Sequence, residues 1–349
     1  MRMGTRWIGL KKLKCNYYLT MNTVDLISNA AENNPVYSLF NNKEVLTFLE
    51  GLEIEKTLWK DDIESERSLR LATKSPKESD DLLHSFKLDP KSFPAKFEEA
   101  IGGDGQEYRR IRTLHSSSLI SLLCFYNVSK TKPLSLSIAG HDIEFDESHF
   151  EKKNPIGQDE DGKPHESNMD VLLKGRDKAT GRDVVFFLES KFSEYLTWGK
   201  HTEISNYVYW KTYSQLFNGG YLDRMGLKYA PMDNNKQYSE LASIKGRTHH
   251  YTSGIKQMVS HFIGVKNIAD TDEYKDCDIY LGEILFRFPE PIDPKGRKFN
   301  DYDGLYKTLA EGLNQLSEDK FKVLDQCLTY QDVFKEYDIE ESVRLFYSL

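Results

Sequence analysis

Two apolar segments near the middle of the chain, separated by a turn, constrain its fold most. The first is SNMDVLL, residues 167–173, and the second is VVFFLESKF, residues 184–192, with glycines between them. Residues 184–188 are apolar at every position, which is typical of a central strand covered on both faces. The pattern predicts a β-hairpin that carries one aspartate on its first strand and Glu-x-Lys at the end of its second.

This hairpin would bring charged residues together. Side chains on a strand alternate between its two faces, so Glu189 and Lys191 point the same way. Antiparallel pairing across the turn places Asp170 opposite either Leu188 or Glu189. Opposed residues lie roughly 4.5 to 5.5 Å apart, which is close enough for two carboxylates to share one hard cation.

Such a grouping of charges favours a divalent-metal site for phosphodiester chemistry. Two carboxylates facing each other in a partly dry cleft repel, and a Mg²⁺ ion relieves the repulsion. Magnesium keeps several waters, so few protein ligands suffice. Lys191 could hold or polarise the attacking water. We also expect Glu189→Gln to leave the fold intact, because the pair repels without metal. The alternative is an ordinary ion-pair cluster at the end of a strand.

These residues and their strands resemble the PD-(D/E)XK nuclease superfamily, with Met169 in place of the proline. The resemblance covers roughly residues 100–290. It implies a restriction-endonuclease-like α/β fold, in which helices flank a mixed central β-sheet. It also implies a Mg²⁺-dependent nuclease, with Mn²⁺ as an alternative metal, that cuts DNA as an endonuclease. In that family's pattern Asp170, Glu189 and the Ser190 carbonyl would bind the metal, and Lys191 would serve the water and the transition state.

The sequence offers a candidate for each part of the family core, which runs helix, three antiparallel strands, helix, strand. A serine cluster able to cap a helix opens the first of them. The hairpin supplies the second and third strands. The other expected elements are a first helix at 114–128, a first strand at 136–145, a second helix at 251–263 and a last strand at 278–288.

Nucleases of this superfamily often add an acidic residue from the first strand or the first helix. Glu144 and Glu147 lie at the end of the expected first strand, and Glu107 lies just before the first helix. We favour Glu147 as the assisting catalytic residue, followed by Glu107. Each of these carboxylates, taken alone, also suits a solvated surface position.

The expected second helix carries candidates for substrate binding. Gln257 and His261 are four residues apart and therefore neighbours on one helix face. In the resembled family a polar residue of this helix, often glutamine, reaches the site or the nucleic-acid backbone. We therefore name Lys256 and Gln257, with His261 behind them. A solvated helix face is the alternative interpretation.

The remaining chain divides by composition. We expect residues 1–20 to be a tail or a start-site artefact, and residues 21–100 to be a helical N-terminal region. The nuclease-like core would span residues 101–290 with an insertion at 195–250, and residues 291–349 would form a helical cap. The insertion is dense in aromatic residues, which can stack unpaired bases but whose spacing fits a core better. They are Tyr207, Tyr209, Trp210, Tyr213 and Phe217.

Charge and cysteine content limit the partners. The net charge of −8 argues against a surface that is basic throughout, although residues 191–211 and 245–250 are locally basic and could line a groove. The four cysteines form no CxxC pair, which excludes an evident zinc knuckle and indicates reduced thiols in a cytoplasmic protein. No apolar run reaches the eighteen or so residues of a membrane span, so we expect no membrane partner. A homodimer stays open.

Two other functions compete with the nuclease. The first is a nucleic-acid-binding or scaffolding protein that kept the fold and no longer cleaves. Loss of a catalytic residue would favour it, yet Asp170, Glu189 and Lys191 are all present. The second is a metal-dependent hydrolase with another substrate, which an acidic site cleft would support.

Overall fold

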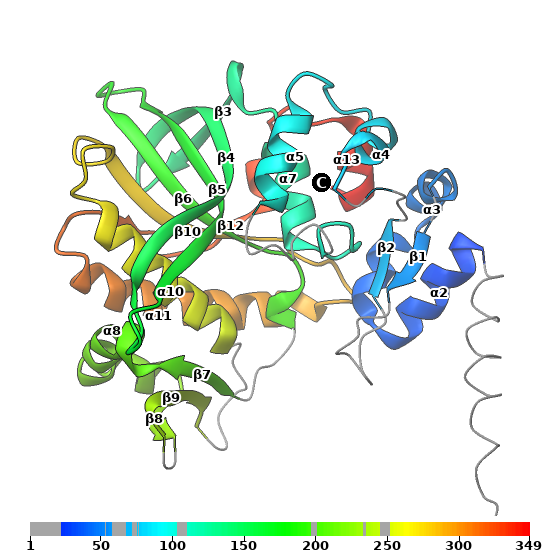
Figure 1. The fold of residues 1–349 in the computed structure, drawn as a ribbon. Coiled ribbons are helices and arrows are strands. Elements are labelled where there is room, and N and C mark those ends of the chain that lie inside the picture. The colour runs from blue at the N-terminus through cyan, green and yellow to red at the C-terminus, as the bar shows by residue number, and fades with distance from the viewer. Residues whose placement is uncertain are drawn as a thin grey trace, which may run out of the picture.

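The structure is a computed structural model, and it describes most of the chain. The central element is a seven-stranded mixed β-sheet with helices packed around it, which confirms the predicted α/β class (Figure 1). In this part of the chain no helix is both long and apolar enough to cross a bilayer. The described residues are 22–52, 54–57, 68–71, 75, 77–102, 110–196, 201–232, 235–244 and 252–349.

The central sheet combines antiparallel and parallel pairing. Four consecutive strands pair antiparallel in sequence order, and a later strand, β10, adds parallel to β6. Two short strands from the C-terminal region then pair parallel with β10. The strands are β3 (Ser129–Ile138), β4 (His141–Gln158), β5 (Pro164–Asp177), β6 (Asp183–Lys191), β10 (Asp278–Leu285), β11 (Lys322–Val323) and β12 (Leu328–Thr329).

The β5–β6 hairpin predicted from the sequence is confirmed, and its register is defined. Val171 lies opposite Leu188. One position further along, this register sets Asp170 against Glu189. Every residue of β6 after its first is buried, as the unbroken apolar run predicted.

The expected first strand, residues 136–145, is wrong. β3 ends at Ile138 and β4 begins at His141, which pair directly across a turn. Ala139 and Gly140 form that turn with φ angles of 53° and 86°, the left-handed region that two-residue hairpin loops require. Apolar residues alternate on both sides of the turn, so the two strands look like one in the sequence.

Two helices pack against opposite faces of the sheet. α7 (Ser117–Phe125) is capped by Ser116, whose hydroxyl accepts a hydrogen bond from the backbone N–H of Leu119 at 3.2 Å. α10 (Thr252–Ile268) lies over β4 and β5. Both helices occur where the sequence placed them, although α10 extends further than expected. At the end of β6, Ser190 forms a hydrogen bond with α7 and the next residue, Lys191, forms one with α10. Because adjacent residues of a strand point to opposite faces of the sheet, α7 and α10 lie on opposite faces.

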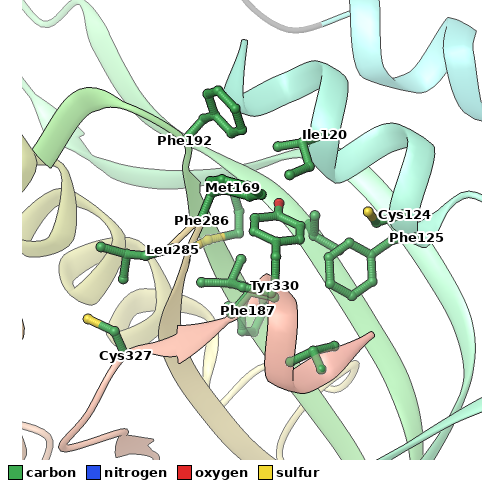
Figure 2. Close-up of a cluster of buried hydrophobic side chains, with 14 of the residues drawn as sticks. Ile120, Cys124, Phe125, Met169, Phe187, Phe192, Leu285, Phe286, Cys327 and Tyr330 are labelled. Carbon is green, nitrogen blue, oxygen red and sulfur yellow. The ribbon is translucent and has the colours of Figure 1, made fainter. Parts of the chain in front are cut away.

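A cluster of buried hydrophobic side chains supports the ends of β5 and β6 on the α7 face (Figure 2). Figure 2 shows Ile120 and Phe125 of α7 gathered around Tyr330, together with Met169 of β5. Tyr330 belongs to α12 (Tyr330–Val333) and is fully buried. Removing a buried aromatic side chain of this size costs roughly 3 to 5 kcal/mol. The charged residues described below therefore project from strand ends that are firmly held.

The segments outside the core are mostly helical, as composition indicated, but they contain strands that were not expected. In the N-terminal region a two-stranded antiparallel sheet lies among the helices. Its elements are α2 (Thr23–Asn33), η1 (Pro35–Phe40), α3 (Lys43–Glu50), β1 (Ile54–Thr57), β2 (Ser68–Leu71), α4 (Asp80–Ser85) and α5 (Phe93–Ile101). The C-terminal region holds η3 (Pro294–Gly296), α11 (Arg297–Leu316), β11, β12, α12 and α13 (Glu341–Tyr347). Through β11 and β12 this region completes the central sheet.

The insertion between β6 and α10 forms a small unit beside α10. Its three strands pair in the order β7-β9-β8, and α8 packs against them. A short 3-10 helix, η2 (Glu194–Leu196), precedes it. The elements are β7 (His201–Ser205), α8 (Asn206–Asn218), α9 (Tyr221–Arg224), β8 (Leu227–Met232) and β9 (Asn235–Ser243).

Candidate active site

The Glu189 carboxylate lies at the centre of a buried charge cluster at the end of β6. Lys191 donates a hydrogen bond from its ammonium group to one carboxylate oxygen of Glu189. The imidazole Nε2 of His261 lies 2.7 Å from the other oxygen. Lys191 also donates to the side-chain oxygen of Gln257 at 2.8 Å. Two residues of β6 and two of α10 are thus joined in one network.

The spacing of α10 explains why its two polar residues reach the strand end. Gln257 and His261 are one turn apart on the same helix face. Gly264 continues that face and lets the helix approach β5, since a Cβ there would lie 2.6 Å from the Ser167 hydroxyl. His261 is almost fully buried, whereas Gln257 is exposed. The network therefore opens to solvent at the Gln257 end.

Asp170 approaches the cluster from β5. One of its carboxylate oxygens accepts a hydrogen bond from the backbone N–H of Ser190 at 2.7 Å, and the residue keeps part of its surface exposed. Burial of the carboxyl group raises its pKa well above the usual value, and the negative charges of Glu189 and Glu151 raise it further. The structure thus brings Asp170, Glu189 and Lys191 together, as the sequence predicted.

Glu151 is an acidic residue of this cluster that sequence reasoning missed. It lies on β4 between Phe150, which pairs with Val171, and Lys152, which pairs with Met169. That position is opposite Asp170. Its φ angle of 50° is in the left-handed region, which is strained for a residue with a side chain. Recognising that β4 continues past residue 145 would have drawn attention to it.

Glu189 is held in its charged form although it is buried. Burial opposes the charge, but the positive charges of Lys191 and His261 outweigh that cost and lower the pKa of Glu189 to about 2. Both ring nitrogens of His261 are buried, and neither forms a hydrogen bond of good geometry with a described residue, so Nε2 meets Glu189 as a close ion-pair contact. His261 therefore acts on Glu189 from inside the protein, and it does not offer the exposed nucleic-acid contact that the sequence suggested.

A second buried glutamate, Glu283 of β10, lies beside Glu189 in the sheet and was also missed. The two residues are direct partners in the parallel β6–β10 pairing. Glu283 has no exposed surface, and one of its oxygens accepts a hydrogen bond from the Tyr302 hydroxyl at 2.8 Å while the other has no described partner. Burial raises the pKa of Glu283 to about 7, the nearby Glu189 charge adding to the effect.

Ser190 anchors the strand end to the opposite face of the sheet. Its hydroxyl donates to the backbone carbonyl of Ser117 at 3.1 Å and lies 2.7 Å from the Tyr330 hydroxyl. Because its own N–H binds Asp170, Ser190 connects the hydrophobic cluster of Figure 2 to the charged cluster. A metal-binding role for its carbonyl stays a prediction.

The first-strand carboxylates named from the sequence do not join the cluster. Glu147 pairs with Lys174 across β4 and β5, four positions from Asp170 or about 13 Å along the strand. It is exposed and lies 2.8 Å from His149. Glu144 is also exposed. The misplaced first strand explains both choices, and Glu151 takes the position that Glu147 was expected to fill.

The other predicted residues divide between those away from the cluster and those not described. The Lys256 ammonium lies over the ring of Tyr209, 5.8 Å from its centroid. Burial lowers the pKa of Lys256. Among the described residues, no hydrogen bond or ion pair joins Lys256 to Glu189. Glu107 and the basic residues 245–250 lie outside the described residues.

The carboxylate oxygens of this cluster are the type of ligand that a hard divalent cation prefers. Three carboxylates, those of Asp170, Glu189 and Glu151, lie at neighbouring strand positions, and the pKa of Asp170 is raised by burial first and by the charges of Glu189 and Glu151 in addition. A cation with oxygen ligands would relieve the repulsion between these charges. Among the described residues, no three His, Cys, Asp or Glu side chains already surround one point as ligands. Metal binding therefore requires Glu189 to exchange one of its present contacts for the ion.

Comparisons with known proteins add no relative to this picture. No protein-family model matches the chain, and no curated protein and no solved structure matches it either. The chemistry of the charged cluster is therefore the basis on which a function can be inferred.

Proposed function

We propose that this protein is a metal-dependent phosphodiesterase, a nuclease that hydrolyses the DNA backbone with Mg²⁺ as cofactor. The observation that carries the proposal is the cluster itself. Asp170 and Glu189 lie one residue beyond the last paired residues of β5 and β6, Lys191 lies two residues after Glu189, and Glu151 occupies the β4 position opposite Asp170. Carboxylates with an adjacent ammonium at the end of a sheet are the groups that metal-assisted phosphodiester hydrolysis needs.

The order of elements supports a restriction-endonuclease-like core as part of the proposal. α7 precedes β4, β5 and β6, which pair antiparallel in sequence order. α10 follows, and β10 then joins parallel to β6. Apart from β3, an additional strand that pairs with the outer side of β4, this order of helix, three antiparallel strands, helix and strand is that of the superfamily that the Asp170 and Glu189-Ser-Lys191 motif resembles.

Each residue has a role in the proposed reaction. Asp170 and Glu151, with one oxygen of Glu189, would hold Mg²⁺, which when bound supplies charge neutralisation at the phosphate and lowers the pKa of a water molecule. Lys191 carries a positive charge that can orient the water and stabilise charge developing on the phosphate. Gln257 holds the Lys191 ammonium from the solvent side.

One observation favours the catalytically silent alternative, a nucleic-acid-binding or scaffolding protein of the same fold. Both carboxylate oxygens of Glu189 are engaged, one by Lys191 and one by His261. A protein that never binds metal could keep such a closed network as a structural element. The two functions differ in one outcome, because only the enzyme cleaves.

The test is a cleavage assay on the purified full chain. Supercoiled plasmid and single-stranded DNA are incubated with Mg²⁺, Mn²⁺ or chelator, using wild-type protein, Asp170→Asn and the control Glu147→Gln. We expect metal-dependent cleavage that falls by at least about 100-fold in Asp170→Asn. Glu147→Gln removes an acidic residue of the same sheet outside the cluster and should stay within twofold of wild type.

Asp170→Asn is the informative variant because it should fold. The substitution is isosteric and removes a carboxylate that burial and its neighbours already disfavour in charged form. Circular dichroism checks that the variant is folded. Wild-type protein that binds DNA but does not cleave it with either metal would support the silent alternative. Cleavage that persists in Asp170→Asn would reject the assigned site.

A further inference from the structure

The two positively charged side chains that hold Glu189 each contact a different oxygen of its carboxylate. The Lys191 ammonium donates a hydrogen bond to Oε1, and the Nε2 atom of His261 lies 2.7 Å from Oε2. Glu189 is almost fully buried, so both oxygens are engaged inside the protein. A divalent cation can therefore bind Glu189 only if one of these contacts gives way, and the two contacts differ in their surroundings.

The Lys191 contact lies on the side of Glu189 that leads to solvent and to the neighbouring carboxylates. Gln257, which accepts a second hydrogen bond from the Lys191 ammonium at 2.8 Å, is exposed. Burial and two neighbouring carboxylates raise the pKa of Asp170, and the charge of Lys191 partly offsets them. Lys191 is therefore within electrostatic reach of Asp170, on the side from which a hydrated ion would approach.

The His261 contact lies on the interior side. Both ring nitrogens are buried, and neither has a hydrogen-bond partner among the described residues to which the ring could turn. The helix that carries His261 packs closely on the sheet, since a Cβ on Gly264 would lie 2.6 Å from the Ser167 hydroxyl. Moving His261 away from Glu189 would therefore require repacking of a dense interior.

Lysine can change its partner at a lower cost than this histidine. Its ammonium is a compact charge with three donors on a flexible chain, so Lys191 can leave Glu189 and keep its hydrogen bond to Gln257. Removing one partner of a buried ion pair is strongly destabilising because it leaves a buried charge uncompensated. Replacement of the ammonium by another cation avoids that cost.

We propose that a divalent cation takes the place of the Lys191 ammonium at Oε1 of Glu189, while His261 keeps Oε2 and acts as the positioning residue of this carboxylate. In the metal-free protein Lys191 thus compensates the charge that the ion would compensate. Lys191 becomes able to serve the attacking water only when the ion is bound. The inference deepens the proposed nuclease function and rests on it for the identity of the ion.

Calorimetric titration of the purified full chain with Mg²⁺ separates this exchange from simple repulsion between charges. Both side chains are positively charged and next to one carboxylate, so repulsion alone predicts that removing either of them strengthens Mg²⁺ binding. We expect opposite changes instead. Lys191→Met should bind Mg²⁺ at least about tenfold more tightly, because no ammonium has to leave. His261→Leu should bind it at least about tenfold more weakly, because Oε2 loses its support.

Two control variants accompany this titration. Lys256→Met removes a lysine of the same helix that has no hydrogen bond or ion pair with Glu189 among the described residues, and its Mg²⁺ affinity should stay within about threefold of the wild type. His261→Gln keeps a hydrogen-bond donor at the position and should recover most of the affinity that His261→Leu loses. Circular dichroism in chelator checks that each variant is folded.

Nuclear magnetic resonance on wild-type protein with labelled lysine side chains observes the displacement itself. The Lys191 signal is assigned by its absence in Lys191→Arg. It should move toward the signals of exposed lysines as Mg²⁺ saturates the protein. This measurement decides the question even if Lys191→Met is too unstable to titrate.

Several results would overturn the inference. They are a wild-type protein that binds no Mg²⁺, a Lys191→Met variant that binds it no more tightly than wild type, a His261→Leu variant that binds it at least as tightly as wild type, and a Lys191 signal that stays in place at saturation. Cleavage of DNA together with a fixed Lys191 signal would refute the exchange and leave the nuclease standing. Opposite changes in affinity without any cleavage would refute the nuclease and leave the exchange standing.

Discussion

Replacing Glu283 by glutamine should stabilise the protein in a way that grows with pH. The carboxyl group has a pKa of about 7 in the folded protein against 4.5 as its ordinary value. A group whose pKa is raised by folding contributes fully to stability below its unfolded pKa, and this contribution is lost as the pH rises through the folded pKa. Wild-type protein is therefore progressively destabilised between about pH 4.5 and 7, whereas a glutamine has no proton to lose.

The size of this effect follows from the shift. One pKa unit corresponds to about 1.4 kcal/mol, so ionisation of Glu283 lowers the free energy of unfolding of the wild type by about 3 kcal/mol in total. About 2.5 kcal/mol of this should develop between pH 5 and 8.5. The new amide group would replace an oxygen that has no described partner, which adds a cost that does not vary with pH. The informative quantity is therefore the change with pH, and not the absolute difference.

Urea unfolding of wild type and Glu283→Gln at several pH values in chelator measures that change. The variant should gain about 2.5 kcal/mol relative to wild type between pH 5 and 8.5. Glu147→Gln, an exposed carboxylate outside the cluster, serves as the control and should show no such trend. A difference between Glu283→Gln and wild type that stays flat with pH would refute the reasoning, since Glu283 would then titrate alike in both states.

Two further substitutions probe the remaining carboxylates. Glu151→Gly removes the left-handed strain of about 1 to 2 kcal/mol, offset in part by the flexibility of glycine in the unfolded chain. Its melting temperature should stay within a few degrees of wild type while metal-dependent cleavage falls at least tenfold, and a large drop in melting temperature would mean that Glu151 is structural. Glu189→Gln should lower the free energy of unfolding by about 3 kcal/mol at pH 7, because the pKa of Glu189 is lowered to about 2 in the folded protein. This destabilisation should disappear as the pH falls through about 2. A variant that is as stable as the wild type at pH 7 would contradict the prediction.

The Glu189 prediction reverses the expectation drawn from the sequence alone. Two facing carboxylates suggested that neutralising Glu189 would be harmless without metal. The sequence could not reveal that His261 is buried against the far side of the same carboxylate, because a helix face with Gln257 and His261 also fits solvent exposure. The order of elements around the site, by contrast, followed from local patterns: the apolar run before Glu189 and the serine cap before α7.

The positions of the acidic residues that the sequence analysis misjudged are set by strand pairing between segments that are distant in the sequence. Glu147 was favoured because the turn at Ala139 and Gly140 was not recognised, which moved the expected end of the strand away from Glu151. Glu283 was within the expected last strand, yet only the parallel pairing of β10 with β6 sets it beside Glu189. Nothing in the local sequence around either residue encodes which strand lies next to it.

Calorimetric titration of the full chain with Mg²⁺ tests most directly whether Asp170, Glu151 and Glu189 share one divalent cation. The cluster predicts saturable binding of one ion per chain in the wild type, with at least tenfold weaker binding in Asp170→Asn and unchanged binding in Glu147→Gln. A wild-type protein that takes up no Mg²⁺ or Mn²⁺, or an Asp170→Asn variant that binds either ion as tightly, would contradict the metal site and the nuclease built on it.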